Sequence, residues 1–512
     1  MKKVKPIVFW PPVVLLIGVV ILNFIRYETF TSVVTSANDW IIQNFGWLFS
    51  LSAVVILGIC IWIYFSPFGD VKIGGADAKP FFNTFEWFMI TLCTTIAAGI
   101  LFWAAAEPIY HITSPPASLG IEPNSHQAAV FAMSTVYLHW TIVPYALYTL
   151  PSLMFAFAFY NMRKPFSLSS MLYPLFGEKA IGKWGEIVDA ICLYTLVAGM
   201  AASLGTGVLT LAGGLNYVFG VKSNKFIWAI LIIAIVMAFV ISASTGLMRG
   251  IRILSIINTR VFFVIMIFSF VFGPTRYILE LGTESLGNFL TLFFQKSLFT
   301  GAASGDQWPK WWTIFYWANW LAWAPISAMF LGRIAYGRTI KEFIMVNLFA
   351  PAMFCGVWMT IYSGTSIYMQ MNGFGLSNIL TQKGPEGIIY AIFSNMPLSK
   401  IIIPFYLFIV FISYVTAADS NTTAMAAMSS TGISPENQEA GVTLKVFWGV
   451  IIGLVAWIMI SFAGVDGIKM ISNLGGFPAL FLEILIAIGI IKVARNPKNY
   501  DFHIRDNGPN RM

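Results

Sequence analysis

Charged side chains are scarce in this sequence: Asp, Glu, Lys and Arg make up only 10% of the 512 residues, whereas 58% are hydrophobic. Soluble domains carry roughly 25% charged residues. A soluble core could not hide this much apolar surface, so the composition predicts an integral membrane protein with the lipid bilayer as its solvent. The net charge of +8 does not indicate nucleic-acid binding, because the basic residues are scattered between apolar runs and form no patch.

Cysteine and histidine are equally rare, with four of each. The cysteines, Cys60, Cys93, Cys192 and Cys355, stand far apart inside apolar runs, and we interpret them as small core residues. The histidines are isolated along the chain. Sequence proximity therefore predicts no metal cluster, and we expect no cofactor.

Catalytic motifs are missing as well. The segment GEKAIGKW, residues 177–184, matches the first positions of a phosphate-binding loop, but it lacks the Ser or Thr that would hold magnesium, and no strand precedes it. We interpret it as a cytoplasmic turn. Neither an ATP-driven pump nor an enzyme is expected, and a channel or an intramembrane enzyme stays a distant alternative.

The sequence has long apolar runs instead. A helix needs about 20 apolar residues to cross a bilayer, and this criterion predicts an all-α protein with twelve spans. They cover residues 8–26, 43–65, 83–104, 128–159, 183–214, 226–244, 252–281, 310–335, 341–370, 400–427, 442–463 and 472–494. The run Ser285 to Leu298 is too short to span, and we expect it to lie in the membrane interface.

The loops between these spans predict the orientation. With the N-terminus in the cytoplasm, most of the 30 Lys and Arg residues fall on the cytoplasmic side, as the positive-inside rule requires. We therefore expect a bacterial inner-membrane protein with both termini in the cytoplasm. The first span has no small-residue cleavage site, and the tails are too short for a separate soluble domain, so residues 1–512 are expected to form one transmembrane domain.

Polar residues interrupt two of the spans. Thr94 to Pro108, TTIAAGILFWAAAEP, is rich in alanine, which permits close helix packing or local unwinding. Phe411 to Met425 carries Asp419, a costly charge at that depth that predicts a functional or structural partner. Arg260 is a similar case, because it lies well inside its span.

Aromatic residues form the third feature. Trp140, Tyr145 and Tyr148 can share one broad helix face, and Trp320 and Trp323 lie one turn apart. Interfacial belts account for tryptophans at span ends but not for these, which lie far from the ends of their spans. A cage for a quaternary ammonium group explains them physically, because such a cation offers no hydrogen-bond donor and is attracted to π-faces.

The segment WWTIFYWANWLAWAPISAMFLGRIAYGRTIKEF, Trp311 to Phe343, resembles the signature of the betaine/choline/carnitine transporter family. HW at 139–140, with the Pro and Tyr that follow, and EPIYHITSPP and IEPNS at 107–125 are similar to other segments of that family. The resemblance implies a LeuT-like fold with two inverted five-helix repeats. It places two extra helices at 1–82, the repeats at 83–281 and 310–494, an interfacial helix and loop at 282–309 and a cytoplasmic tail at 495–512. It also implies a homotrimer.

The resemblance further implies how the site is built. The trimethylammonium head of a zwitterion or choline-like cation would lie at the midplane between aromatic rings, and Trp312 would lie on the outer access path. Where the family usually has Trp, this chain has Tyr145 and Asn319, whose added polar atoms could serve a different substrate. The implied substrate-binding residues are Trp140, Tyr145, Tyr148, Asn319, Trp320, Trp323, Ser327, Ala98 and Gly99.

The same resemblance also bears on the driving force of transport, through the positions that bind sodium in the family. Sodium-coupled members have threonines where this chain has Leu196 and Met200, and Thr-Ser where it has Thr416 and Ala417. Sodium prefers oxygen ligands, so two sodium sites lose oxygens. Met200 instead matches the sodium-independent carnitine/γ-butyrobetaine exchanger. The arginine that replaces one sodium ion in that exchanger is Asn258 here, with Arg260 two positions on as a poor substitute.

These residues favour an exchanger of quaternary-ammonium substrates by alternating access. A sodium- or proton-coupled importer of glycine betaine or choline stays open, because Ser327 and Thr416, with carbonyls of residues 97–99, could rebuild one ion site. The sequence firmly predicts no bound metal.

Overall fold

The structure is a computed structural model that describes residues 4–96, 99–244, 247–432 and 441–506. Within these ranges the chain is helical, and the only β contacts are two isolated bridges, Val4 with Ser430 and Lys72 with Thr339. The predicted all-α class is therefore confirmed.

Most helices overlap the predicted spans, but α2 (Tyr27–Phe65) begins 16 residues before the predicted start at residue 43, and the predicted span 252–281 runs past the end of α10 (Leu247–Phe272). In chain order they are α1 (Pro6–Ile25), α2 (Tyr27–Phe65), α3 (Thr84–Ile96), α4 (Gly99–Thr113), α5 (His126–Trp140), α6 (Ile142–Ala156), α7 (Tyr173–Phe176), α8 (Lys183–Phe219), α9 (Lys225–Ser244), α10 (Leu247–Phe272), α11 (Thr275–Thr291), α12 (Phe293–Ser297), α13 (Trp308–Trp311), α14 (Thr313–Arg333), α15 (Ile340–Ile344), α16 (Ala350–Met371), α17 (Leu376–Lys383), α18 (Glu386–Ser394), α19 (Ser399–Met428), α20 (Val442–Arg495) and α21 (Phe502–Asp506). Short 3₁₀ or π turns lie between some of them, at Pro67–Asp70, Ala117–Leu119, Phe157–Asn161, Leu168–Leu172, Gly177–Ala180, Met345–Phe349 and Pro497–Asn499.

Membrane-crossing helices can be recognised by their length and composition. Seven continuous helical segments in the described ranges are long and apolar enough, and eight if Ile256–Phe272 and Thr275–Thr291, bent by 105°, count as one span. Helices α3 and α4 are each too short to be counted, whereas α20 counts once although Ala463 and Gly464 break it into two helices. The count of twelve spans stays a prediction.

Helix breaks lie where the sequence is rich in small or polar residues. Between α5 and α6 the backbone of Thr141 leaves helical geometry, with φ −111° and ψ −121°. In α20 Gly464 adopts φ 55°, a conformation that glycine reaches without a steric penalty. Such breaks let side chains and backbone groups face an interior site in the middle of a span.

The outer surface is apolar. Large hydrophobic side chains on the outer helices are exposed, among them Ile21 and Phe24 of α1 and Val264 and Ile267 of α10. A soluble protein would not expose such a surface, so these helices face lipid. The predicted interfacial run falls on α11 and α12, and α11 turns sharply away from the direction of α10.

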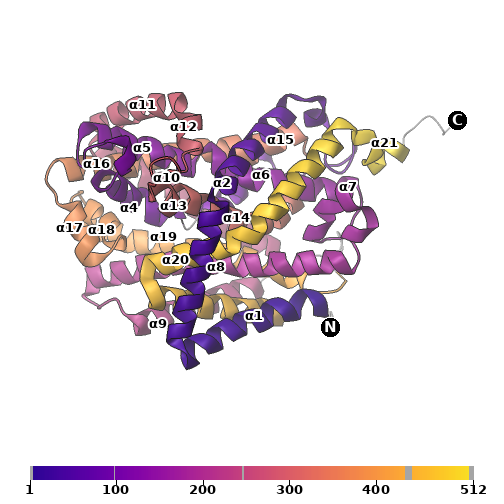
Figure 1. Cartoon of the computed structure of the whole chain (residues 1–512), viewed down its shortest axis with the longest axis horizontal. Helices are drawn as coiled ribbons and strands as arrows, with labels where there is room; N and C mark the ends of the chain where they lie inside the picture. The colour runs from indigo at the N-terminus through magenta and orange to yellow at the C-terminus, as the bar shows by residue number, and fades with distance from the viewer. Residues whose placement is uncertain (1–3, 97–98, 245–246, 433–440, 507–512) are drawn as a thin grey trace.

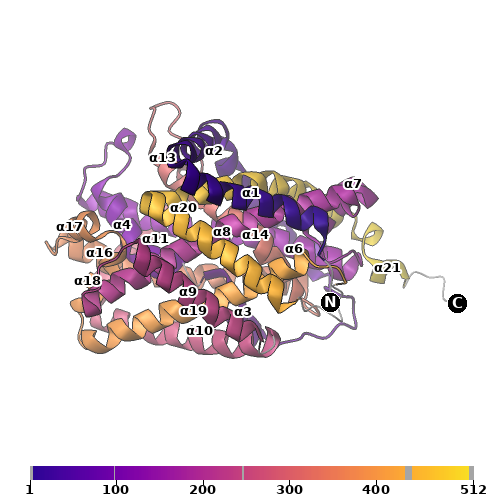
Figure 2. The same cartoon turned by 90° about the horizontal axis from the view of Figure 1, so that it is seen from below.

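The core is built around α8 and α14, which lie near the middle of the molecule in both views (Figures 1 and 2). Helix α20 packs along α8, and α14 packs between α6 and α20. The loop with α7 and the C-terminal α21 lie at one end of the long axis, opposite α17 and α18. The two segments predicted to be cytoplasmic thus share one end, and their assignment to the cytoplasm stays a prediction.

Candidate functional site

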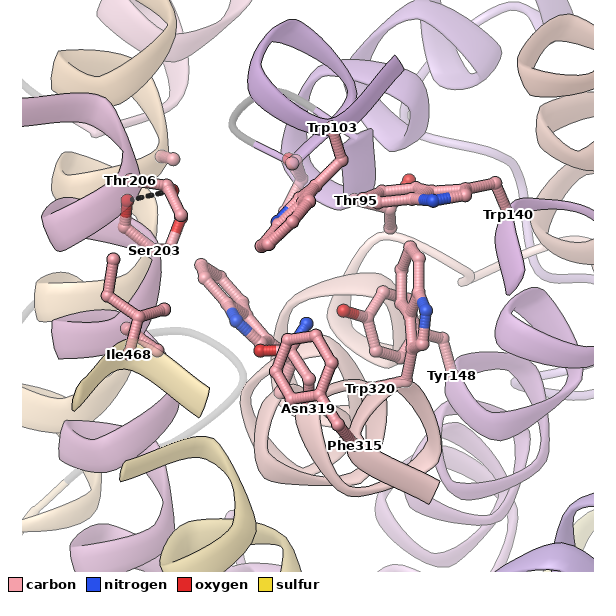
Figure 3. Close-up of a pocket in the computed structure, with 15 residues that line it drawn as sticks. Thr95, Trp103, Trp140, Tyr148, Ser203, Thr206, Phe315, Asn319, Trp320 and Ile468 are labelled. Carbon is pink, nitrogen blue, oxygen red and sulfur yellow. Dashed lines mark hydrogen bonds between the residues drawn. The ribbon is translucent and has the colours of Figure 1, made fainter. Parts of the chain in front are cut away.

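A small cavity lies in the centre of the bundle, beside Thr94 and Thr95 of α3 and Gly99 of α4. Its volume is about 50 Å³. Helices α3, α4, α5, α6, α8, α14, α19 and α20 contribute to its wall, and Figure 3 shows its aromatic and hydroxyl-bearing side chains. The lining residues are Thr94, Thr95, Gly99, Trp103, Trp140, Tyr148, Ala202, Ser203, Thr206, Phe315, Asn319, Trp320, Trp323, Ala417 and Ile468.

Trp320 is the central ring of an aromatic cage on one side of this cavity. Its centroid lies 5.4 Å from that of Trp140, 5.1 Å from Tyr148 and 5.9 Å from Tyr145. The rings of Trp140 and Tyr148 meet it at steep angles, 77° and 63°. Edge-to-face packing of this kind is the preferred geometry of aromatic pairs, and it leaves ring faces beside the cavity.

The polar atoms of these rings are bonded behind the cage. Trp140 donates its Nε1–H to Oε2 of Glu107 at 2.6 Å, and Trp320 donates its Nε1–H to the carbonyl of His139 at 3.1 Å. A Cβ atom at Gly99 would lie 2.5 Å from Cη2 of Trp140, so only glycine permits this approach of ring to backbone. The indoles are therefore fixed by hydrogen bonds that do not involve the cavity.

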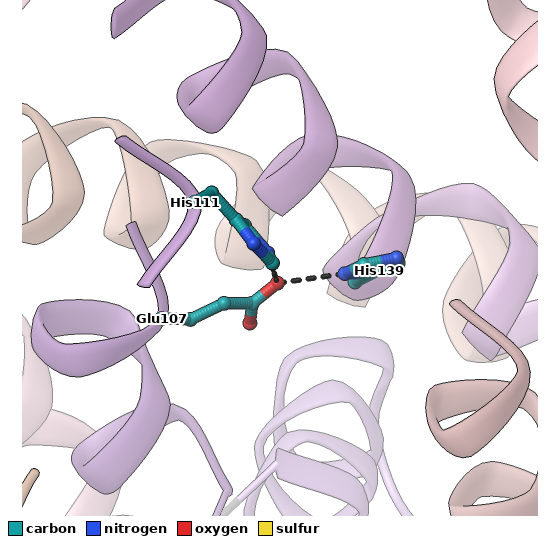
Figure 4. Close-up of side chains that lie close together, drawn as sticks. All are labelled: Glu107, His111 and His139. Atoms are coloured by element: carbon teal, nitrogen blue, oxygen red, sulfur yellow. Dashed lines mark hydrogen bonds and ion pairs between the residues drawn. The ribbon is translucent and has the colours of Figure 1, made fainter. Parts of the chain in front are cut away.

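The carboxylate of Glu107 joins α4, α5 and α14. Oε1 lies 3.0 Å from Nε2 of His111 and 2.7 Å from Nδ1 of His139, as Figure 4 shows. Oε2 accepts from Trp140 and from the hydroxyl of Tyr316, at 2.6 and 2.5 Å. Four donors can compensate the burial of a charge that is otherwise costly. Sequence proximity had predicted no histidine cluster; helix packing brings two of the four histidines together.

The same trio can be considered as a metal site. Ligand atoms of Glu107, His111 and His139 all lie within 4.8 Å of one another. However, both imidazoles already hydrogen-bond to one carboxylate oxygen, and the other oxygen is engaged by Trp140 and Tyr316. These contacts account for the whole arrangement without an ion.

The remaining wall of the cavity carries hydroxyl and amide groups. Thr94 and Thr95 donate to carbonyls one turn earlier in α3, and Thr206 donates to the carbonyl of Ser203. Asn319 uses Oδ1 to accept from Ser472 at 2.9 Å, which leaves its amide N–H groups as donors at the cavity. This wall can thus offer both acceptor oxygens and donor N–H groups to a ligand.

Some residues predicted for the substrate site lie outside the cavity wall. Tyr145 is fully buried behind the cage, and its hydroxyl lies 3.1 Å from Sγ of Cys355. Ser327 is buried but does not line the cavity. Ala98 falls outside the described residues. The other predicted residues, Trp140, Tyr148, Asn319, Trp320, Trp323 and Gly99, all line the cavity.

Trp312 lines a second cavity of about 520 Å³, together with Lys469 and residues of α2 and α13. Nζ of Lys469 lies 3.9 Å from the centroid of the Trp312 ring. Phe315 lines both this cavity and the inner one, so its ring separates them. This position suits the predicted place of Trp312 on an access path.

The residues predicted for ion sites are not brought together as one site. Met200 and Ala417 line a cavity of about 20 Å³, where Nδ2 of Asn421 donates to Sδ of Met200 at 3.0 Å. Asn258 is paired with Ser413 at 2.9 Å, and Arg260 is exposed on the outer side of α10.

Thr416, the remaining predicted ion-site residue, donates its hydroxyl to the carbonyl of Ile412. The hydroxyl of Thr416 therefore has no further hydrogen to donate, but its oxygen can still accept a hydrogen bond or contact a cation.

Several cavity residues were not singled out from the sequence. Thr94, Thr95 and Trp103 belong to the segment 94–108, whose small and polar residues were a visible signal. Ser203, Thr206 and Ile468 gave no such signal, because they are ordinary members of apolar helices. Their place in the wall follows from the packing of α8 and α20.

Comparison with known proteins identifies the family. The model of the betaine/carnitine/choline family transporters matches residues 7–499. A probable glycine betaine transporter of Desulfitobacterium hafniense is 31% identical, over 92% of this chain and 93% of that protein. The glycine betaine transporter OpuD of Bacillus subtilis is 30% identical, over 94% and 92%. The osmo-independent choline transporter BetT1 of Acinetobacter baylyi is 29% identical, over 96% and 94%.

Among solved structures, a Na⁺-coupled sialic acid symporter in a substrate-bound outward-open state matches with a TM-score of 0.46 and 13% identity, over 90% of this chain and 97% of that one. A likeness of this degree carries no argument about coupling. The chain belongs to the betaine/carnitine/choline transporter family. It is a multi-pass membrane transporter, and the prediction that it is not an enzyme is confirmed.

Proposed function

We propose that this betaine/carnitine/choline family transporter carries a small quaternary-ammonium compound by alternating access, with the ammonium head in the aromatic cage. One observation carries the proposal: the residues that line the inner cavity include six aromatic side chains and no charged one. A trimethylammonium group has no N–H to donate, so a carboxylate could not hydrogen-bond to it, whereas π-faces attract it by about 0.5–2 kcal/mol each.

The size of the cavity bears on the transport mechanism. Ligand pockets have volumes of roughly 300–1,000 Å³, whereas this cavity has about 50 Å³. A substrate can therefore enter only after the walls move apart. Phe315, which lines both this cavity and the cavity of Trp312, is the part of the wall best placed for such a movement. The break at Gly464 in α20, shortly before the wall residue Ile468, offers a hinge.

The zwitterionic substrates of this class also carry a carboxylate. Asn319 has amide N–H groups at the cavity, since its oxygen is held by Ser472. We assign the carboxylate to the amide of Asn319 and the ammonium head to the cage around Trp320, the next residue of α14. Carnitine, γ-butyrobetaine and glycine betaine fit this division, and choline would use the cage alone.

For the driving force we favour exchange of one substrate for another. Met200 offers a thioether, a soft ligand that suits sodium poorly, and the neighbouring Ala417 has no oxygen in its side chain. A sodium-coupled importer is the second candidate. Its supporting observation is Oδ1 of Asn421, a buried oxygen without a hydrogen-bond partner among the described residues, on the amide that contacts Met200.

Uptake into proteoliposomes tests both candidates. Vesicles are preloaded with betaine, carnitine, γ-butyrobetaine or nothing, in sodium or in potassium buffer. Exchange predicts uptake only into preloaded vesicles, equally in both buffers. Accumulation in empty vesicles under an inward sodium gradient would contradict exchange and support the importer.

The assembly and membrane placement are proposed as well. We infer a protein of the bacterial inner membrane with both termini in the cytoplasm, supported by the distribution of basic loops and by the shared end of α7 and α21. A homotrimer is proposed from the family resemblance alone. Accessibility of cysteines placed near each terminus in right-side-out vesicles, and the mass of the purified particle, test these two points.

A further inference from the structure

The carboxylate of Glu107 lies between two cavities. On one side its partner Trp140 lines the inner cavity. On the other side its partner His139 bonds through Nε2 to Oγ1 of Thr313 at 3.0 Å, and Thr313 lines a separate cavity of about 240 Å³. The wall of that cavity also includes Leu119, in the loop after α4, and Gln127, near the start of α5. The cluster of Glu107, His111 and His139 thus has one face toward the inner cavity and one face toward the protein surface.

The hydrogen bonds define the proton count of the cluster. Both imidazoles point a nitrogen at the same oxygen of Glu107, and an ionised carboxylate is satisfied when both nitrogens carry hydrogen. Each imidazole is then neutral, and the cluster has a net charge of −1. His139 next accepts at Nε2 from the hydroxyl of Thr313.

One further proton has a place in this arrangement. If Nε2 of His139 takes it, the Thr313 hydroxyl needs only to rotate from donor to acceptor, and the imidazolium forms an ion pair with Glu107. Nδ1 of His111 is a poorer place, because it is buried without a hydrogen-bond partner among the described residues and its ring lies against Trp308 and Trp312. His139 is therefore the base, and Thr313 connects it to the cavity that Leu119 and Gln127 line.

The surrounding charges allow this proton to leave again. Lys296 of α12 bonds to Ser134 and Thr135 of α5, and Lys469 of α20 lies over Trp312. Both cations oppose an added positive charge. The other titratable groups near the cluster are His111, Tyr316, Tyr110 and Asp466. Asp466 lines the same cavity as Lys469 and offsets part of its charge.

Helices α16 and α11 bond to α4 and α5 through uncharged groups. Ser363 and Ser366 of α16 donate to the carbonyls of Ala104 and Ala105 on α4, and on α11 the carbonyl of Gly282 accepts from Tyr137 of α5.

We propose that the Glu107–His139 pair is a proton-binding site whose proton competes with the quaternary ammonium in the cage, an inference that rests on the proposed function of that cage. With the pair unprotonated, the charge of Glu107 lies behind Trp140 and attracts the cation. With the pair protonated, the cluster is neutral and the attraction is lost. Binding of the cation therefore releases the proton, and by linkage each ligand lowers the affinity of the other by the same factor.

In an exchanger this competition has a consequence for the transport cycle. A proton on the pair replaces the positive charge that the substrate brings to the bundle centre. The protonated carrier could then return without substrate, which would permit slow exchange of a cation for a proton beside exchange of substrate for substrate.

Proton release by the purified full-length carrier tests the proposal directly. Choline is added in weakly buffered detergent solution with a pH-indicator dye, and binding is followed in parallel by tryptophan fluorescence between about pH 5 and 8. We expect release of up to about one proton per choline bound, and a dissociation constant that rises by up to about tenfold per pH unit on the acid side. Choline binding without proton release would overturn the proposal but leave the proposed function intact, whereas failure of every quaternary ammonium to bind would contradict the proposed function itself.

Three variants locate the proton. His139→Asn keeps an N–H at the position of Nδ1 and cannot titrate, so choline should still bind but release no proton. Thr313→Val has nearly the same shape and removes the partner of Nε2, so release should shift to lower pH even if the Asn variant fails to fold. His126→Asn, at the exposed start of α5, is the matched control and should behave as wild type. Wild-type release in the first two variants would overturn the assignment to His139.

Discussion

The two sides of the inner cavity differ in what holds their side chains. On the side of α5, α6 and α14, the rings of the cage are fixed by bonds to Glu107 and to the carbonyl of His139. On the side of α8 and α19, the contact between Met200 and Asn421 is a weak bond to sulfur, and Oδ1 of Asn421 and Oγ1 of Thr423 are buried without partners among the described residues. The first side is preorganised for a ligand; the second is not preorganised for an ion.

This difference predicts which side of the cavity contributes most of the binding free energy of the substrate. A preorganised cage loses little entropy when the ligand binds, so the aromatic side should dominate affinity. An ion on the opposite side would find few side-chain oxygens, because Met200 offers a thioether and Ala417 a methyl group. The hydroxyl of Thr416 donates to Ile412 and keeps only its oxygen lone pairs for an ion. Variants on the two sides should therefore differ in size and kind of effect.

The largest effect is expected from Trp320→Ala. This change removes the ring that contacts Trp140, Tyr145 and Tyr148, and the affinity for betaine or choline should fall by roughly 10- to 30-fold, as measured by tryptophan fluorescence or calorimetry. Trp320→Phe should keep most of the affinity. Equal binding by wild type and the Ala variant would place the ammonium head elsewhere.

A smaller but qualitative effect is expected from restoring oxygens on the other side. The double variant Met200→Thr, Ala417→Ser gives a sodium ion two hydroxyl ligands in place of a thioether and a methyl group. Uptake into empty vesicles should become sodium-stimulated by about threefold or more, whereas wild-type uptake should not respond to sodium. Met200→Leu with Ala417→Ser serves as the control. Sodium-driven uptake by the wild type would contradict the proposed difference between the two sides of the inner cavity.

Replacement of Asn319 should lower the affinity for zwitterionic substrates but not the affinity for choline. Asn319→Ala removes the amide donors that we assign to the substrate carboxylate. The affinity for glycine betaine or carnitine should fall by about tenfold, since one hydrogen bond to a charged group contributes about 1.5 kcal/mol. Choline binding should be nearly unchanged. Ser472→Ala, which removes only the partner of Oδ1, is the comparison variant. An equal loss for all three ligands would indicate that Asn319 acts through packing.

The smallest effect is expected at Tyr145. Its hydroxyl lies against Sγ of Cys355 and not in the cavity, so Tyr145→Phe should change the affinity for every substrate by about twofold or less. The sequence alone had suggested that this hydroxyl meets a polar group of the substrate. A substrate-selective loss in the Phe variant would show that the side chain turns toward the ligand during transport.

Much of the site could be predicted because its residues carry local signals. Trp140, Tyr148, Trp320 and Trp323 are aromatic residues in the middle of apolar spans, where neither a lipid-facing surface nor an interfacial belt accounts for them. The place of Thr94, Thr95 and Trp103 at the cavity could be expected from the small and polar residues of segment 94–108. The position of Tyr145 behind the cage could not, because it depends on which turn of α6 faces α14.

The composition and the apolar runs by themselves determined that the chain is an all-helical membrane protein, since few charges and long apolar stretches leave no other solvent or backbone arrangement. Only the tertiary structure decided that Glu107, His111 and His139 form one cluster, because they lie 32 residues apart at the extremes and meet only where α4 packs on α5. It also decided that the predicted ion-site residues stay apart, with Asn258 turned to Ser413 and Arg260 to the outside. Sequence periodicity fixes the face of one helix, whereas the partner of that face is set by how whole helices pack.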